Sequence, residues 1–198
     1  MELPFSAACE RNREPILAVL REHFADRARV LEIGSGTGQH AVHLAAALTQ
    51  LIWQTSDVVA NLPGIEAWLA EARLPNTPPP LLVDVDRDWP CGQWDAAYSA
   101  NTLHIMSWEQ DQRFFAGLGS VLAPDATLAI YGPFRYGGNF TSPSNEEFDR
   151  SLRDSAAHMG IRDIEAVLSL ANEHGFKLSQ DIGMPANNQM LIFKREAR

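Results

Sequence analysis

The chain has 198 residues, and its 16 lysines and arginines against 25 aspartates and glutamates give a formal net charge of −9. The negative charge and the lack of a basic stripe argue against nucleic-acid binding, because phosphate contacts supply much of that affinity. A length near 200 residues with 45% hydrophobic residues predicts one globular domain over residues 1–198.

The cellular setting follows from what the sequence lacks. No apolar run approaches the ~18 residues of a membrane span, and the first residues lack the basic and apolar segments of a signal peptide. Two cysteines, Cys9 and Cys91, predict neither a disulfide framework nor a metal site. We therefore expect a cytoplasmic protein with neither membrane nor nucleic-acid partners.

Strands and helices alternate over the first two thirds of the chain. The spacing of apolar residues predicts a first helix over 12–24, with Pro15 in its first turn. The following pattern predicts, in chain order, strand 29–33, helix 39–48, strand 51–55, helix 61–73, strand 81–83, strand 94–99, helix 108–121 and strand 127–131. Such alternation predicts a parallel sheet with helices on both faces.

The alternation stops after residue 131. Residues 132–144 are rich in glycine, proline and asparagine, which predicts a functional loop. Two amphipathic helices are expected over about 145–155 and 161–172. They precede two strands, 176–182 and 189–194, whose connection is short enough for a hairpin. The predicted fold is α/β, with a doubly wound, seven-stranded, mainly parallel sheet whose last strand is antiparallel.

The most informative segment, residues 30–38, reads VLEIGSGTG between a predicted strand and a predicted helix. Its glycines allow the backbone to approach a ligand closely. The dinucleotide fingerprint needs a glycine where Gln39 stands, and a P-loop needs a lysine that is absent. The segment therefore disfavours a pyrophosphate or triphosphate ligand.

The same pattern resembles the first motif of class I methyltransferases, which use S-adenosylmethionine (SAM). In that family the acidic residue that ends the first strand, here Glu32, orders the turn near the amino-acid end of the cofactor. The glycines leave room for the methionine part. The resemblance implies that the cofactor is bound by Glu32, Gly34, Ser35, Gly36 and Gly38.

Further cofactor contacts are expected where the next strands end, because ligands bind at the carboxyl ends of parallel strands. Asp57 follows the second strand, and its carboxylate can accept both ribose hydroxyls. The resemblance implies that Asp84 and Val85 read the adenine and that Asn101 contacts cofactor or substrate. Each polar residue also fits a structural role, Asp57 as a helix cap and Asp84 and Asn101 in turns.

Five stretches indicate a closer resemblance over nearly the whole chain. They are Arg11-Asn12-x-x-Pro15-Ile16-Leu17, Ser35-Gly36-Thr37-Gly38-Gln39-His40, Tyr131-Gly132-Pro133, Ser142-Pro143-x-Asn145 and Met184-Pro185-Ala186-Asn187-Asn188. Together they resemble the poorly characterised group that includes methyltransferase-like protein 26. This resemblance implies the methyltransferase fold and leaves the substrate open.

Two residues are candidates for catalysis. His104 follows the fourth strand, and its imidazole can accept a proton near neutral pH; Tyr131 ends the fifth strand. The alternatives are a hydrogen-bonded structural histidine and a core aromatic residue. His40 and His43 are expected on a helix surface, so no metal site is predicted.

The substrate is expected to meet the first helix and the final connection. Arg11, Asn12 and Asn187 are the candidate substrate-binding residues, and Arg11 is suited to pairing with a carboxylate. The first helix is a candidate lid over the pocket. Ordinary helix capping by Asn12 and a solvated Arg11 are the alternative.

Together these patterns predict a SAM-dependent methyltransferase with a small-molecule acceptor. Residues 99–102 (SANT) lack the Asn/Asp-Pro-Pro-Tyr/Phe motif of enzymes that methylate amide or base nitrogens. The alternative is a SAM-binding protein of the same fold without catalytic activity, because no diagnostic base motif is present. A nicotinamide-dependent oxidoreductase is disfavoured by Gln39. The sequence defines neither the acceptor nor the oligomeric state.

Overall fold

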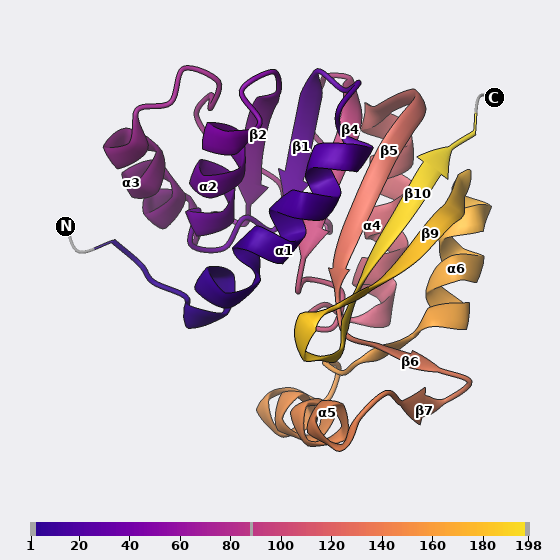
Figure 1. Cartoon of the computed structure of the whole chain (residues 1–198). Coiled ribbons are helices and arrows are strands. Elements are labelled where there is room, and N and C mark those ends of the chain that lie inside the picture. Colours follow the sequence, from indigo (N-terminus) through magenta and orange to yellow (C-terminus); the bar gives the residue numbers. More distant parts are fainter. Residues whose placement is uncertain (1–2, 88, 197–198) are drawn as a thin grey trace.

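The computed structural model describes residues 3–87 and 89–196, and a seven-stranded sheet forms its centre (Figure 1). The strands are β1 (Arg29–Ile33), β2 (Ile52–Asp57), β3 (Leu81–Leu82), β4 (Trp94–Ala100), β5 (Leu122–Gly132), β9 (Phe176–Met184) and β10 (Asn188–Arg195). Their order across the sheet is β3-β2-β1-β4-β5-β10-β9. The first five run parallel, and β10 runs antiparallel to β5 and β9. The predicted fold class is confirmed.

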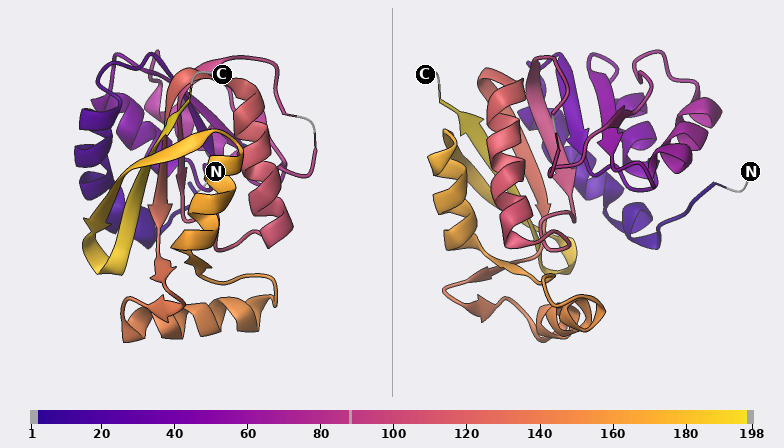
Figure 2. Two further views of the ribbon diagram at one scale, coloured as in Figure 1. Left: turned by 90° about the vertical axis from the view of Figure 1, so that its right-hand side faces the viewer. Right: turned by 180° about the vertical axis from the view of Figure 1, so that it is seen from behind.

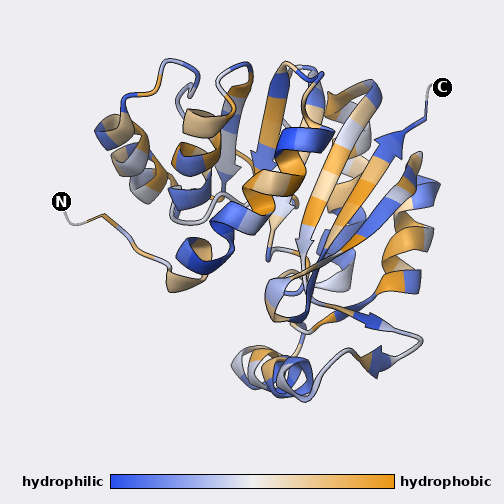
Figure 3. Ribbon diagram, in the orientation of Figure 1, coloured by the Kyte–Doolittle hydropathy of each residue, from blue (hydrophilic) through white to orange (hydrophobic). Residues whose placement is uncertain are grey.

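Helices cover both faces of this sheet (Figure 2). On one side lie α1 (Ala7–His23), α2 (Gln39–Ala47) and α3 (Leu62–Ala72); on the other lie α4 (Trp108–Val121) and α6 (Ile164–Glu173). Because strand side chains alternate between faces, Val30 packs under α1 and α2 while Leu31 joins the core beneath α4 and α6. Figure 3 shows that β5 and α6 are largely hydrophobic.

The first helix begins five residues earlier than the prediction from residue 12. The Ser6 hydroxyl caps α1 by accepting a hydrogen bond from the Cys9 amide at 3.4 Å. Pro15 therefore lies inside the helix rather than in its first turn, and Asn12 is not the cap. The apolar spacing did not reveal this first half because buried core residues begin only at Ile16.

The predicted loop over 132–144 contains two short strands and belongs to a larger insert, defined as residues 133–163. Strands β6 (Phe134–Tyr136), β7 (Asn139–Phe140) and β8 (Arg162–Asp163) form a second sheet in the order β7-β6-β8. Together with α5 (Pro143–Ser155) they lie beyond the carboxyl ends of β4 and β5 (Figure 1). Since β8 occupies residues expected to be helical, α6 begins at Ile164.

Polar contacts hold the insert against the main sheet. The Tyr136 hydroxyl donates to Asp181 Oδ2 at 2.7 Å, and the Gly160 amide donates to the His104 carbonyl at 2.9 Å. In the part of the chain that the structure describes, no helix is both long and apolar enough to cross a membrane.

We expect Phe115→Ala to lower the free energy of unfolding by about 3–5 kcal/mol, because a fully buried ring would leave a cavity. The Phe115 ring packs edge-to-face or tilted against Phe114, Phe176 and Phe193, at ring-centroid distances of 5.3–6.4 Å. Urea denaturation checks the loss. The matched control is Phe5→Ala, since Phe5 is 68% exposed. Equal losses in both variants would contradict the assignment of the core.

Candidate functional site

A cavity of about 1120 Å³ lies at the carboxyl ends of the parallel strands. The strand order reverses between β1 and β4, and such switch points are where open α/β sheets bind ligands. The volume exceeds the 300–1,000 Å³ that is typical of a pocket for one small molecule. The cavity can therefore hold a cofactor and a second small molecule together.

The glycine turn after β1 forms the floor of this cavity. The amides of Gly34 and Ser35 both donate to the Ser56 carbonyl, at 3.1 and 3.0 Å. Gly34 has a φ of +74°, and a Cβ there would lie 2.7 Å from the Thr102 hydroxyl. Gly34, Ser35 and Gly36 line the cavity. Gly38 does not; it precedes α2 and packs closely against the backbone of Ile65.

Glu32 lies beneath this turn and does not line the cavity. Its carboxyl group is buried and accepts hydrogen bonds from Trp53 Nε1 at 2.9 Å and Ser35 Oγ at 3.0 Å. Burial raises the pKa of Glu32 to about 7, while the two hydrogen bonds act in the opposite direction. Glu32 thus fixes Ser35 from behind.

Asp57 holds the turn from the adjacent strand and lines the cavity. Its Oδ2 accepts the Gly36 amide at 2.7 Å, and its Oδ1 accepts from the Val58 amide at 2.7 Å and from Asn61 Nδ2 at 2.9 Å. A carboxylate offers about four acceptor positions. Three are occupied, so Asp57 as placed has room for one further strong hydrogen bond rather than the two expected from the sequence.

The segment that follows β3 forms the next part of the cavity wall. Asp84 and Val85 both line it, next to Val83. The Asp84 carboxylate accepts the Asp86 amide at 3.0 Å and lies 3.3 Å from Arg87 Nε. Asp84 and Val85, which were predicted to bind the adenine, therefore lie in a loop that the Asp84 side chain stabilises.

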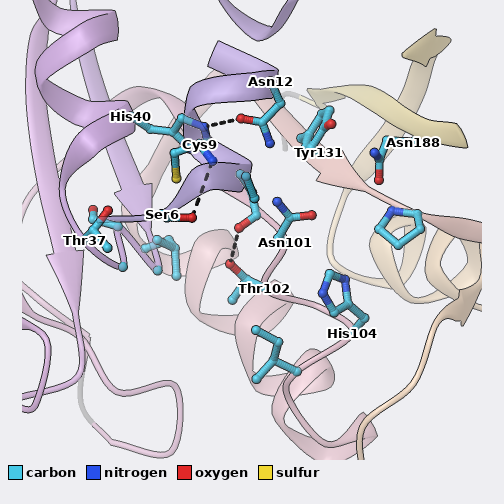
Figure 4. A pocket seen from close by; sticks show the side chains of 18 of the residues that line it. Ser6, Cys9, Asn12, Thr37, His40, Asn101, Thr102, His104, Tyr131 and Asn188 are labelled. Carbon is cyan, nitrogen blue, oxygen red and sulfur yellow. Dashed lines mark hydrogen bonds between the residues drawn. The ribbon is translucent and has the colours of Figure 1, made fainter. Parts of the chain in front are cut away.

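His104 and Asn101 meet at the other half of the cavity (Figure 4). A Cβ on Gly132 would lie 3.8 Å from His104 Nδ1 and 3.9 Å from Asn101 Oδ1, so both side chains converge over this glycine. His104 is only 5% exposed and stands edge-on to Phe148 at 5.3 Å. Among the described residues its ring nitrogens have no hydrogen-bond partner.

Burial lowers the pKa of His104 to about 4, and the nearby positive charge of Arg162 acts in the same direction. The imidazole is therefore neutral near pH 7. Tyr131 also lines the cavity, and burial raises its pKa, although hydrogen bonds from Asn12 and Asn188 partly offset that rise. Its phenol therefore stays protonated and can donate a hydrogen bond.

The first half of α1 forms one wall, and Arg11 and Asn12 both line it. Asn12 Oδ1 lies 2.7 Å from His40 Nε2 (Figure 4). His40 was expected on a helix surface, but it is 6% exposed and lines the cavity. Its position two residues after Gly38, the last glycine of the turn, is the sequence signal that points to this role.

Asn187 is the candidate substrate-binding residue that the structure leaves outside the cavity. Its side chain is exposed and lies 3.4 Å from Ser144 Oγ, while its neighbours Ala186 and Asn188 line the cavity.

Other residues that line the cavity were not predicted, because they follow no strand of the main sheet or lie in or next to the unpredicted part of α1. They include Ser6, Cys9, Ser144, Asn145 and Phe148. No group of acidic, histidine and cysteine residues suited to a metal ion occurs within residues 3–87 and 89–196.

Solved structures share this architecture. One is the SAM-dependent methyltransferase SibL in its apo form, with a TM-score of 0.83, 22% identity, and coverage of 96% of this chain and 56% of that chain. Another is an O-methyltransferase family protein from Burkholderia thailandensis, with a TM-score of 0.83, 15% identity, and coverage of 96% and 58%. Human N-acetylserotonin methyltransferase in complex with SAM has a TM-score of 0.80, 12% identity, and coverage of 96% and 53%.

These similarities define the class: the chain has the fold of the SAM-dependent methyltransferases. It spans little more than half the length of the structures it matches. The chain itself belongs to the family described as "Protein of unknown function (DUF938)", whose model matches residues 3–195.

The burial of His104 predicts a pH effect on stability. The folded-state pKa of His104 is about 4, below the ordinary value of 6.5, so the unfolded chain binds the proton more tightly. His104 therefore contributes stability that is present above pH 6.5 and is lost as the pH falls toward 4. We expect His104→Gln to remove about 1–3 kcal/mol of this pH dependence.

Urea unfolding at pH 7.5 and pH 4.5 measures this difference. His40→Gln is the matched variant and should have the same sign, because burial also lowers the pKa of His40 to about 4. If wild type and His104→Gln lose equal stability between the two pH values, His104 is not buried as described.

Proposed function

We propose that this protein is a SAM-dependent methyltransferase that acts on a small-molecule acceptor within one domain over residues 1–198. The observation that carries this proposal is the glycine turn held on Asp57 at 2.7 Å, opening on a cavity large enough for two ligands. The fold shared with SAM-dependent methyltransferases supports it.

The residues around the cavity suit SAM. Asp84 and Val85 would hold the adenine, Asp57 a ribose hydroxyl, and the turn Gly34–Gly36 the methionine part, next to Asn101. Glu32 and Gly38 would act from outside the cavity by shaping the turn. When bound, SAM supplies a methyl group, whose bond to sulfur breaks with both electrons left on sulfur as the acceptor atom bonds to carbon.

We propose His104 and Tyr131 as the catalytic residues. A neutral, buried imidazole can accept a hydrogen bond from an acceptor hydroxyl and then take its proton during transfer. The protonated Tyr131 can orient the same group by donating a hydrogen bond. The His104 imidazole, which has no hydrogen-bond partner among the described residues, favours a catalytic site over a protein that only stores SAM.

The stretches that resemble the group including methyltransferase-like protein 26 all contribute to the cavity. Each supplies lining residues, among them Arg11, His40, Pro133, Asn145 and Asn188. This common location supports a relationship to that group. We further propose a cytoplasmic location, which suits the two free cysteines.

The first half of α1 is proposed as a lid over the cofactor. Cys9 and Asn12 of this helix and its capping residue Ser6 face the cavity, and polar contacts tie the helix to α2 (Figure 4). The Trp68 indole donates to the Pro4 carbonyl at 2.8 Å and holds the preceding segment. A lid fixed by polar contacts can open without disrupting the apolar core.

Calorimetric titration with SAM, S-adenosylhomocysteine and NADH tests the cofactor. We expect wild type to bind SAM and S-adenosylhomocysteine but not NADH. Asp57→Ala should weaken binding by about 1–3 kcal/mol, because a charged hydrogen-bond acceptor is lost. The control Asp26→Ala changes an exposed carboxylate that does not line the cavity and should bind like wild type. Folded wild type that binds neither SAM nor S-adenosylhomocysteine would refute the proposal.

Thiol labelling tests the lid. Cys9 lies half-buried beside the cavity and burial raises its thiol pKa, whereas Cys91 is exposed and serves as an internal control. Saturating S-adenosylhomocysteine should slow labelling of Cys9 by roughly tenfold or more, because a closed lid protects the thiol. Labelling of Cys91 should not change. Equal Cys9 rates with and without ligand would argue against the lid.

A further inference from the structure

Charge is distributed unevenly along the cavity. Its two carboxylates, Asp57 and Asp84, lie at the ends of β2 and β3. Neighbouring strands lie about 4.8 Å apart, so the end of β4 is two spacings, roughly 10 Å, from Asp57. We call the part of the cavity formed by α1, α5, the β9–β10 connection and the segments after β4 and β5 the acceptor half. No described residue that lines the acceptor half carries a carboxylate.

Among the described residues that line the acceptor half, Arg11 carries a formal positive charge. Within the described chain its exposed guanidinium has no ion pair and no hydrogen bond. Its helix neighbours are paired instead, Arg13 with Glu10 at 2.8 Å and Glu14 with His43 at 3.3 Å. Arg11 and Tyr131 both line the cavity, and the positive charge of Arg11 acts to lower the pKa of Tyr131.

The remaining groups of the acceptor half are uncharged. His104 is neutral, and the Asn101 and Asn188 amides face the same space (Figure 4). Ile105 and Phe148 supply an apolar rim and are 47% and 42% exposed. A ligand that satisfies all these groups has an apolar body, a hydroxyl and a negative charge.

We infer that the acceptor is a small hydroxylated compound with a carboxylate, which pairs with Arg11 while the hydroxyl faces His104 and Asn101. A cationic amine would lie near the positive charge of Arg11, and no carboxylate lining the acceptor half would balance the two charges. Repulsion between like charges would therefore weaken its binding. This inference rests on the proposed function and specifies its substrate class.

Three probes of one shape test the charge preference: 4-hydroxybenzoate, 4-hydroxybenzamide and 4-hydroxybenzylamine. Each is titrated into the protein saturated with S-adenosylhomocysteine, and binding is followed by ligand-observed NMR. The expected order of affinity is carboxylate, then amide, then amine, with roughly tenfold or more between the first and last. Arg11→Gln should reduce this ratio to about threefold or less and leave S-adenosylhomocysteine binding within about twofold.

Arg13→Gln is the matched control, because Arg13 lies on the same helix but does not line the cavity. It should preserve the order and the ratio of the probes. Equal binding of amine and carboxylate, or binding of no probe at millimolar concentration, would overturn the inference. So would an Arg11→Gln variant that loses S-adenosylhomocysteine binding but keeps the probe ratio, since Arg11 would then serve the cofactor. Wild type that fails to bind S-adenosylhomocysteine would instead refute the proposed function.

Discussion

The cavity depends on how the turn after β1 is tied to the end of β2. Three consecutive amides, from Gly34 to Gly36, donate to the Ser56 carbonyl and to Asp57 Oδ2. Buried amides need partners, and here the neighbouring strand provides them, so the turn keeps its shape without a ligand. Glu32 supports the same turn from below through Ser35. Because the donors follow β1 and the acceptors end the adjacent strand β2, pairing of the two strands also sets the shape of the site.

Two walls of the cavity, the first half of α1 and helix α5, are built in different ways. The polar first half of α1 covers the cavity, whereas its second half carries Ile16 and Leu20 into the core. Pro15 stands between the halves, and a proline inside a helix removes one backbone hydrogen bond. The opposite wall is α5, which the insert brings over the ends of β4 and β5 (Figure 1). The proposed lid would therefore open to admit a ligand without loss of core packing.

The sequence correctly predicted the helices and strands whose apolar residues, at regular spacing, face the hydrophobic core. The strand over 29–33 and the helix over 108–121 match β1 and α4. A buried apolar run marks the strand, and apolar residues at helical spacing after the capping Ser107 mark the helix. The start of α1 and the strands of the insert were missed, since polar segments that cover a cavity carry no apolar period. His40 was assigned to the surface for a related reason. Its burial depends on Asn12, which lies 28 residues away in the chain.

A crystal structure of the protein with S-adenosylhomocysteine tests the central claim most directly, because it locates the cofactor relative to the turn. We expect a ribose hydroxyl within hydrogen-bond distance of Asp57 Oδ2, the adenine beside Val85, and an intact hydrogen bond from the Gly36 amide to Asp57. The acceptor half around His104 should remain free for a second molecule. A nucleoside bound elsewhere, or an Asp57 that has released Gly36, would contradict this description of the site.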